Sequence, residues 1–382
     1  MAEAYIISAV RTPIGRRRGM FSDILPLTLA TVAVKEAVAR AGIEPNLVDD
    51  VIMGCVTPLG EQGANIARLT VLNARFPVTV PGVTINRMCG SSQQALHFAA
   101  QAILAGDMDI VVAAGVEHMT RVPMMSDYPQ TWPEDFPYQL VHQGISAELI
   151  AEKWGLTRML LDQFGFESHR KAARATREGW FNSEIIPMEI PYDSGTRTVT
   201  IDEGIRFDTS LDKMLALKPA FKEDGVITAG NSSQISDGAA ALVVASEDAV
   251  KRLGLKPMAR LVTRVVIGDD PVLMLAGVIP ATRQVLARAG LRVEDIDVFE
   301  VNEAFASVVL AWMAEIQPPD PDRVNPRGGA IALGHPLGAS GARIMTTLVH
   351  ELAQTGGRYG LQVMCIGHGM ATATIVENLM DR

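Results

Sequence analysis

Apolar and polar residues along the chain alternate between short apolar runs and longer segments with helical spacing. Residues 5–10 form the first apolar run, and residues 27–41 then show helical spacing that stops at Gly42. A second run at 48–54 is followed by a second helical segment at 65–74. Apolar runs that alternate with helical segments in this way predict strands and helices of an α/β fold.

The pattern of the first half recurs in the second half. Residues 39–43 (Ala-Arg-Ala-Gly-Ile) match residues 287–291 (Ala-Arg-Ala-Gly-Leu), 248 positions further on. The strand after each copy keeps this register, and the same offset aligns Gly90 with Gly338. A period this long excludes a solenoid and indicates internal duplication. It predicts two similar α/β halves that each direct a glycine-rich strand-to-helix turn towards a shared centre.

A stretch of different composition, residues 119–234, separates the two halves. Proline and aromatic residues crowd its start, at 123–138. Long loops of this composition in a compact protein are typical of binding loops or lids, although a surface insertion or an oligomer contact would look the same. We predict an N-terminal half at 1–118 plus 235–258, an inserted loop domain at 119–234, and a C-terminal half at 259–382.

Composition and charge exclude several classes of partner. The chain has 382 residues, of which 48% are hydrophobic and 20% charged, as in ordinary globular proteins. Its net charge is −9, and its longest basic run is the short one at 16–18. We therefore expect no nucleic acid or anionic membrane as partner. The apolar segments are also too short to predict a membrane span.

The cysteines indicate a reducing compartment. Cys55, Cys89 and Cys365 form neither a CxxC pair nor an even-numbered framework. The first residues lack a charged and then apolar leader. We expect a cytoplasmic protein.

Cys89 lies at a predicted strand-to-helix turn. An apolar segment at 80–85 precedes it, and helical residues 93–104 follow it, ending before Gly106. Free N–H groups and the helix dipole at a helix start favour a thiolate over a thiol. Gly90 and the two serines after it leave room for a reactant. The alternative is an ordinary buried cysteine.

Three further polar positions have compositions that packing alone does not explain. Asn302 follows a predicted strand at 297–301, His335 lies in a glycine-rich turn before a helix, and Cys365 ends a strand. The duplication makes the His335 turn the counterpart of the Cys89 turn. A cysteine with a histidine in reach is the basic unit of thiol nucleophilic catalysis. A second thiol suits acid/base work at a carbon acid, and an amide such as that of Asn302 suits an oxyanion.

Each of these positions also has a simpler explanation. Cys365 fits a core position, and His335 fits a helix cap. A metal site of Cys89, His335 and Cys365 would contain no two ligands close in sequence, so we expect no metal.

Several motifs resemble those of the thiolase family, in the family's order, from residue 4 to about 378. They are Ala9-Val10-Arg11-Thr12-Pro13-Ile14-Gly15, Asn86-Arg87-Met88-Cys89-Gly90-Ser91, the segment from Thr228 to Ala240, Asn302-Glu303-Ala304-Phe305, Gly334-His335-Pro336 and Cys365-Ile366-Gly367.

The resemblance implies a thiolase fold, five-layered α-β-α-β-α, built from two duplicated halves with an inserted loop domain. It also implies roles for the polar positions. Cys89 would accept the acyl group, and His335 would activate it. His335 and a water held by Asn302 would form one oxyanion hole, and the N–H groups of Cys89 and Gly367 the second. Cys365 would be the acid/base at the α-carbon of acetyl-CoA.

The resemblance further implies that coenzyme A and acyl-CoA are substrates, with no permanently bound cofactor. Ser233 and Arg206 would contact coenzyme A, Phe221 would line the pantetheine tunnel, and His142 would lie near it. Phe305 is a further expected contact. Members of the family form oligomers, so we expect a homodimer or homotetramer, with the inserted domain supplying oligomer contacts.

The chain departs from the family pattern at two positions. Gln143 stands where the family usually has methionine in His-Met-Gly, and His368 stands where it often has glycine. Both positions border the acyl pocket in the family. We therefore expect a degradative 3-ketoacyl-CoA thiolase of fatty acid β-oxidation with a longer or bulkier acyl group. A biosynthetic acetoacetyl-CoA thiolase, which condenses two acetyl-CoA, is the alternative. His368 either narrows the site, adds an acid/base group or points to solvent.

Two other classes share this fold. A non-catalytic acyl-CoA or lipid-binding protein would need none of Cys89, Asn302, His335 and Cys365. A decarboxylating condensing enzyme of the ketoacyl-synthase type would need two histidines beside its nucleophile, where this chain has Asn302 and Cys365. Acyl chain length, physiological direction and pathway stay open at this point.

Overall fold

The computed structural model describes residues 3–193 and 195–380. Its strands are β1 (Ala4–Arg11), β2 (Gly15–Arg16), β3 (Asp50–Gly54), β4 (Gly82–Ile85), β5 (Ile110–His118), β6 (Met188–Tyr192), β7 (Gly195–Val199), β8 (Ser236–Ser246), β9 (Ala259–Gly268), β10 (Val298–Val301), β11 (Tyr359–Ile366) and β12 (Met370–Asn378). Its α-helices are α1 (Pro26–Ala41), α2 (Ile66–Asn73), α3 (Ser91–Ala105), α4 (Gln143–Lys153), α5 (Arg158–Arg177), α6 (Leu211–Leu215), α7 (Glu247–Leu253), α8 (Val278–Ala289), α9 (Ala306–Ile316), α10 (Ala330–Leu333) and α11 (Ser340–Thr355).

The main sheet runs through both halves of the chain. Its strand order is β10-β11-β12-β9-β1-β8-β5-β3-β4, with β2 beside β8, while β6 and β7 form a separate hairpin. Strand β1 pairs with β9 only through Tyr5 with Arg260 and Ile6 with Ala259. A narrow ladder therefore joins the two parts of the sheet, one from each half of the chain.

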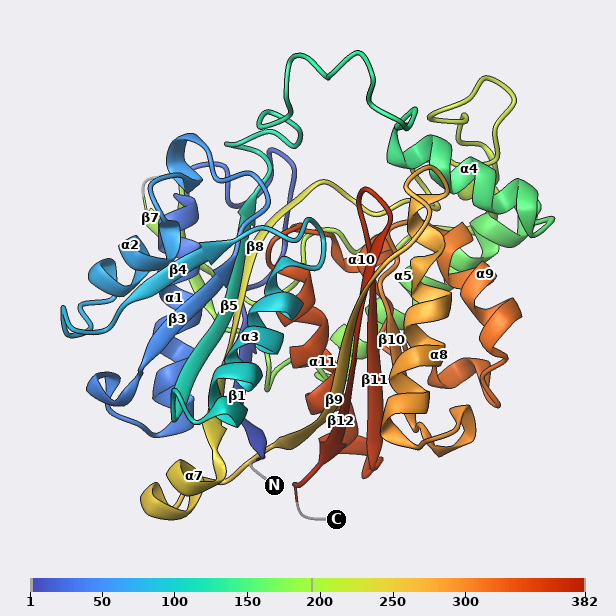
Figure 1. Ribbon diagram of the computed structural model, residues 1–382. Coiled ribbons are helices and arrows are strands. Elements are labelled where there is room, and N and C mark those ends of the chain that lie inside the picture. Colours follow the sequence, from blue (N-terminus) through green and yellow to red (C-terminus); the bar gives the residue numbers. More distant parts are fainter. Residues whose placement is uncertain (1–2, 194, 381–382) are drawn as a thin grey trace.

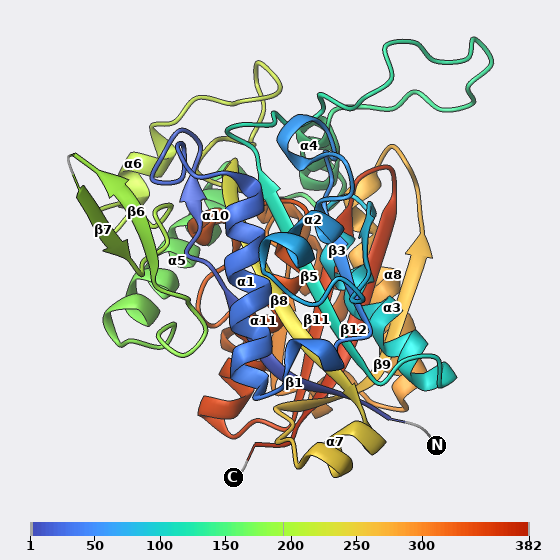
Figure 2. The ribbon, with the colours of Figure 1, turned by 90° about the vertical axis from the view of Figure 1, so that its left-hand side faces the viewer.

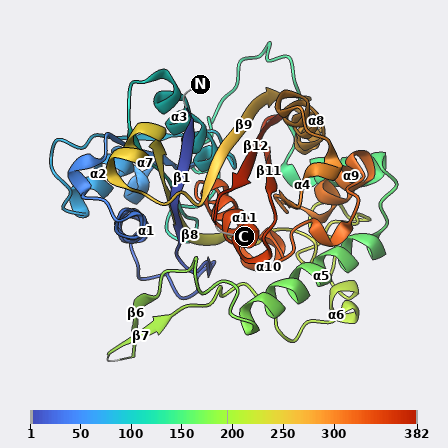
Figure 3. The ribbon, with the colours of Figure 1, turned by 90° about the horizontal axis from the view of Figure 1, so that it is seen from below.

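Helices and sheets stack in the five expected layers (Figure 1). Helices α1 and α2 cover the outer face of the first half's strands, and α8 and α9 cover the outer face of the second half's strands. Helices α3 and α11 lie between the two sheets and pack against each other. The view from below separates the two halves around this central pair (Figure 3). The predicted five-layered α-β-α-β-α arrangement is confirmed.

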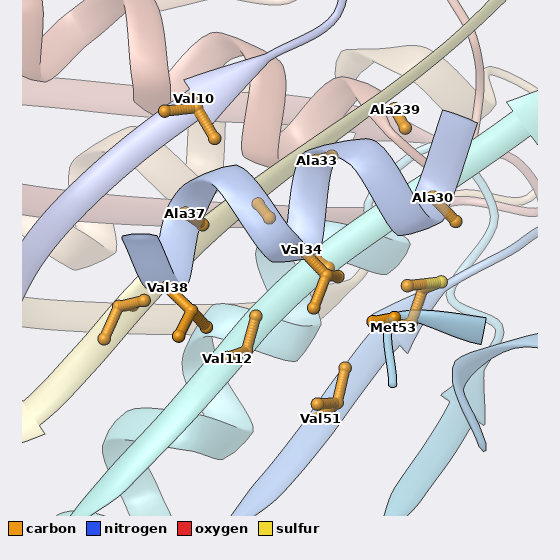
Figure 4. Close-up of a cluster of buried hydrophobic side chains, with 14 of the residues drawn as sticks. Val10, Ala30, Ala33, Val34, Ala37, Val38, Val51, Met53, Val112 and Ala239 are labelled. Carbon is orange, nitrogen blue, oxygen red and sulfur yellow. The ribbon is translucent and has the colours of Figure 1, made fainter. Parts of the chain in front are cut away.

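The outer layer of the first half packs through one apolar face of α1. Pro26 opens this helix, and Gly42 ends it in the left-handed conformation with φ 68°. In Figure 4, Val34 and Val38 point towards Val112 and the neighbouring strands of the sheet. Burial of each such side chain stabilises the fold by roughly 1.5–3 kcal/mol.

The central layer is tight because the starts of α3 and α11 touch. A Cβ at Gly341 would lie 2.3 Å from the backbone nitrogen of Gln93, so only glycine fits there. The hydroxyl of Ser92 accepts a hydrogen bond from the Ala342 N–H at 2.9 Å. The Cys89 turn and the His335 turn, which precede these two helices, are thereby held next to each other.

The segment between β5 and α4 is a long loop that extends away from the body of the protein (Figures 1 and 2). This loop carries the proline- and aromatic-rich residues 123–138. The rest of the segment that separates the two halves in sequence contains helices α4, α5 and α6 and the β6–β7 hairpin. Within residues 3–193 and 195–380, no helix is both long and apolar enough to cross a bilayer.

Candidate active site

Cys89 lies in the turn that links β4 to α3. Met88 adopts a left-handed backbone conformation with φ 45°, and the helix begins two residues after Cys89, at Ser91. The Ser91 hydroxyl accepts from the Arg87 N–H at 2.9 Å and donates to the Met88 carbonyl at 2.6 Å. The turn thus holds Cys89 at the amino end of α3, with its side chain buried.

His335 lies in the matching turn before α11. Its Nδ1 is 2.5 Å from the Ser340 hydroxyl, and that hydroxyl donates its single proton to the Pro336 carbonyl at 2.9 Å. The Ser340 oxygen must therefore accept from His335 Nδ1, which places the imidazole proton on Nδ1. His335 Nε2 therefore carries the lone pair, as a base requires.

Asn302 lies between His335 and Cys365, directly after β10. Its Nδ2 is 3.5 Å from His335 Nε2 and 3.7 Å from Cys365 Sγ. Its backbone N–H donates to the Val363 carbonyl at 3.0 Å, which extends the β10–β11 ladder by one bond. Asn302 Oδ1 is buried and has no hydrogen-bond partner among the described residues. The amide can therefore orient the imidazole and the second thiol together.

Burial keeps the reactive groups neutral before substrate binds. Burial first, and then the nearby Cys365, raises the pKa of Cys89 to about 12. Burial also raises the pKa of Cys365 to about 11, although the Asn302 side chain opposes the rise. Burial and then the Arg343 charge lower the pKa of His335 to about 3. The position of Cys89 at a helix start led us to expect a thiolate. The resting form is instead the thiol, because burying a charged sulfur costs more free energy than the helix N-terminus returns.

Two backbone N–H groups oppose the rise in the pKa of the Cys89 thiol, that of Gly367 and that of Cys89 itself. Gly367 follows β11, whose last residues include Cys365. The β11 end thus brings the second thiol and one donor to the same place as Cys89.

A cavity of about 260 Å³ leads to Cys89. Most of its wall is apolar, and its large apolar residues are Met88, Met124, Met125, Trp132, Leu140, Met274 and Leu337. His368 also lines it, with a left-handed backbone at φ 63°. His368 Nε2 is 3.3 Å from the Tyr128 hydroxyl, so the histidine faces the cavity loop and not bulk solvent.

The residues expected to contact coenzyme A fall into two groups. The rings of His142 and Phe221 stack with centroids 5.2 Å apart, and Phe305 meets Phe221 edge-on at 5.9 Å. Arg206 lines a separate cavity of about 360 Å³. The Ser233 backbone N–H donates to the Ala304 carbonyl at 2.9 Å, so this N–H already has a partner within the protein.

Sequence reasoning missed three residues of these sites. Ser340 sets the His335 tautomer, and its position five residues later at a helix start was a usable signal. His169 is buried beside Arg206, and its Nδ1 accepts a hydrogen bond from the Arg206 backbone N–H at 3.2 Å. Nothing in the local sequence distinguishes His169, or Tyr128, from packing residues. In the described part of the chain, no three His, Cys, Asp or Glu side chains gather as metal ligands would.

Known proteins with similar sequences and structures match almost the whole chain. The family described as "Thiolase, N-terminal domain" matches residues 4–248, and "Thiolase, C-terminal domain" matches residues 255–378. A steroid 3-ketoacyl-CoA thiolase of Mycobacterium tuberculosis is 48% identical over 393 residues, covering 99% of this chain and 95% of the relative.

Two solved structures are similar over the same length. Human mitochondrial 3-ketoacyl-CoA thiolase superposes with a TM-score of 0.92 at 36% identity, and the Bacillus anthracis acetyl-CoA acetyltransferase with 0.93 at 38%. Each comparison covers 99% of both chains.

Proposed function

The chain belongs to the thiolase family, and from that premise we propose that it is a 3-ketoacyl-CoA thiolase. It cleaves a 3-ketoacyl-CoA with coenzyme A to give acetyl-CoA and an acyl-CoA two carbons shorter. One observation carries this proposal: Cys89 and Cys365, together with the Asn302–His335 pair, meet at the ends of β10, β11 and two facing helices.

In the first half-reaction, the Cys89 sulfur attacks the 3-keto carbon while His335 Nε2 takes the thiol proton. The bond between carbons 2 and 3 then breaks, and acetyl-CoA leaves as an enolate. The Cys365 thiol donates its proton to carbon 2, which leaves an acyl group on Cys89, a Cys365 thiolate and an imidazolium.

In the second half-reaction, the Cys365 thiolate takes the proton of coenzyme A, and the coenzyme A sulfur attacks the acyl carbon. Cys89 leaves as a thiolate and regains its proton from His335. Each step forms an oxyanion. The N–H groups of Cys89 and Gly367 form one hole, and His335 with a water held by Asn302 forms the other.

The cavity beside Cys89 favours the degradative assignment over the biosynthetic one. Its volume of about 260 Å³ is larger than that of an acetyl group, although the part beside His142 would take the end of the pantetheine arm. An apolar wall with several methionines suits a longer or bulkier hydrocarbon, because such side chains adapt to irregular shapes. The acetoacetyl-CoA thiolase assignment predicts instead that the part of the cavity lined by methionines is unused.

A panel of 3-ketoacyl-CoA chain lengths, assayed for thiolysis, tests the proposal, with Cys89→Ala as the control. We expect turnover that rises beyond acetoacetyl-CoA and disappears in the variant. A strong preference for acetoacetyl-CoA would replace the degradative assignment with the biosynthetic one. No turnover at any length would instead support a non-catalytic acyl-CoA-binding protein.

For coenzyme A itself, we propose two contact regions. The His142–Phe221–Phe305 group would hold the pantetheine arm, and Arg206, beside His169, would meet a phosphate; Ser233 is a further proposed contact. We propose that residues 119–234 form this binding domain and add oligomer contacts, in a homodimer or homotetramer. Residues 1–118 plus 235–258, and 259–382, would be the two thiolase halves. The three free cysteines support a cytoplasmic location.

A further inference from the structure

Gln143 is the first residue of α4 and lines the cavity that leads to Cys89. The preceding residue, His142, caps this helix and accepts the Gly144 N–H through Nδ1 at 3.1 Å. The Phe221 ring packs so closely on Gly144 that a Cβ there would lie 2.2 Å from it. Both contacts fix the start of the helix, so the position of Gln143 is determined by the fold.

The Gln143 amide lies against the turn that supplies the Gly367 N–H. Its Nε2 is 3.2 Å from the place where a Cβ at Gly367 would stand. Gln143 and Cys89 line the same cavity, and the Gln143 side chain, like the Gly367 N–H, opposes the rise in the thiol pKa. Gln143 therefore approaches the reacting sulfur from the side of the cavity.

We propose that Gln143 is a further catalytic residue, whose side-chain amide donates a hydrogen bond to the Cys89 sulfur and stabilises its thiolate. A donor binds a charged acceptor about twice as strongly as a neutral one, so it favours the thiolate over the thiol. The thiolate appears twice in the cycle, at attack on the keto carbon and when Cys89 leaves the acyl group. The inference rests on the proposed function of Cys89 as the nucleophile.

The test is the rate at which iodoacetamide alkylates Cys89 between pH 7 and 10, with the labelled cysteine identified by peptide mass. Gln143→Met keeps the length of the side chain and removes the donor. We expect it to raise the thiol pKa by about one unit, which lowers the Cys89 labelling rate roughly tenfold at each pH below the pKa. Gln163→Met, the same change on α5, is the matched control and should leave the profile unchanged.

Gln143→Glu provides a second, nearly isosteric variant in case the methionine disturbs folding. A carboxylate cannot donate and repels a thiolate, so we expect the labelling rate to fall at least as far. A Gln143→Met or Gln143→Glu profile that overlays the wild type would overturn the inference.

Labelling needs no substrate, so the inference and the proposed function fail separately. Shifted labelling with no thiolysis at any chain length would sink the proposed function alone. Thiolysis with unshifted labelling would sink the role of Gln143 alone.

Discussion

Replacing Ser340 with alanine should impair catalysis through His335 without touching any reacting atom. The Ser340 hydroxyl accepts a hydrogen bond from the His335 Nδ1–H at 2.5 Å and donates one to the Pro336 carbonyl at 2.9 Å. Both side chains are buried, with 0% of Ser340 and 3% of His335 exposed. Water therefore does not readily replace the lost acceptor, and the tautomer with a free Nε2 loses its stabilisation.

The size of the effect follows from the cost of a buried donor with no acceptor, which is about 1–3 kcal/mol. If that cost falls wholly on the reactive tautomer, kcat/KM should drop roughly 5- to 150-fold. The loss should appear mainly in kcat, because Ser340 is not placed to bind the acyl or coenzyme A parts of the substrate.

Steady-state thiolysis of one good 3-ketoacyl-CoA measures this, with thermal unfolding alongside. Thr346→Ala is the matched control, because Thr346 also donates a buried hydroxyl to a carbonyl four residues earlier on α11, at 2.8 Å. We expect a similar loss of stability in both variants and a loss of kcat in Ser340→Ala alone. Wild-type kcat in Ser340→Ala would refute the argument that this hydroxyl sets the tautomer.

Three further predictions test the other parts of the site and the pH dependence of stability. Cys365→Ala should abolish exchange of the acetyl-CoA α-protons with deuterated solvent, while Cys89 is still acylated by an acyl-CoA; persistent exchange would remove Cys365 from its role. Arg206→Ala should raise the KM for coenzyme A roughly tenfold, the equivalent of about 1.4 kcal/mol, with kcat unchanged. An unaltered KM would place the phosphate elsewhere. Burial lowers the pKa values of His335 and His97 to about 3, below the ordinary 6.5, so the unfolded chain binds more protons between these values. The contribution of each histidine to the free energy of unfolding should therefore fall as pH drops below 6.5, by up to about 1.4 kcal/mol per pH unit, whereas Glu300, whose pKa burial raises to about 8, contributes in the opposite direction. Urea titrations of the wild type and of His97→Gln measure the histidine contribution, and the same change in stability between pH 7 and pH 5 in both proteins would contradict it.

Much of the fold was predictable because its signals are local and repeated. The helix at 27–41 stops at Gly42 in both sequence and structure, since a left-handed glycine at a helix end is encoded by one residue. The offset of 248 residues then aligned the starts of the two central helices at Gly90 and Gly338. The polar positions Cys89, Asn302, His335 and Cys365 were identifiable from the sequence for a similar reason. Each lies at or shortly after the end of an apolar run, in a segment whose composition packing alone does not explain.

Tertiary structure decided the protonation of these groups and the identity of their partners. A helix start favours a thiolate at Cys89, but burial by residues from both halves reverses that preference. The folded structure alone shows which atoms lie next to Ser340, Gln143 and the Tyr128–His368 pair, and the roles of these residues follow from those neighbours. Desolvation and hydrogen-bond geometry depend on segments far apart in the chain, as with Tyr128 and His368, which are 240 residues apart. The sequence therefore identifies which residues can react, and the packing of the two halves determines their protonation states before substrate binds.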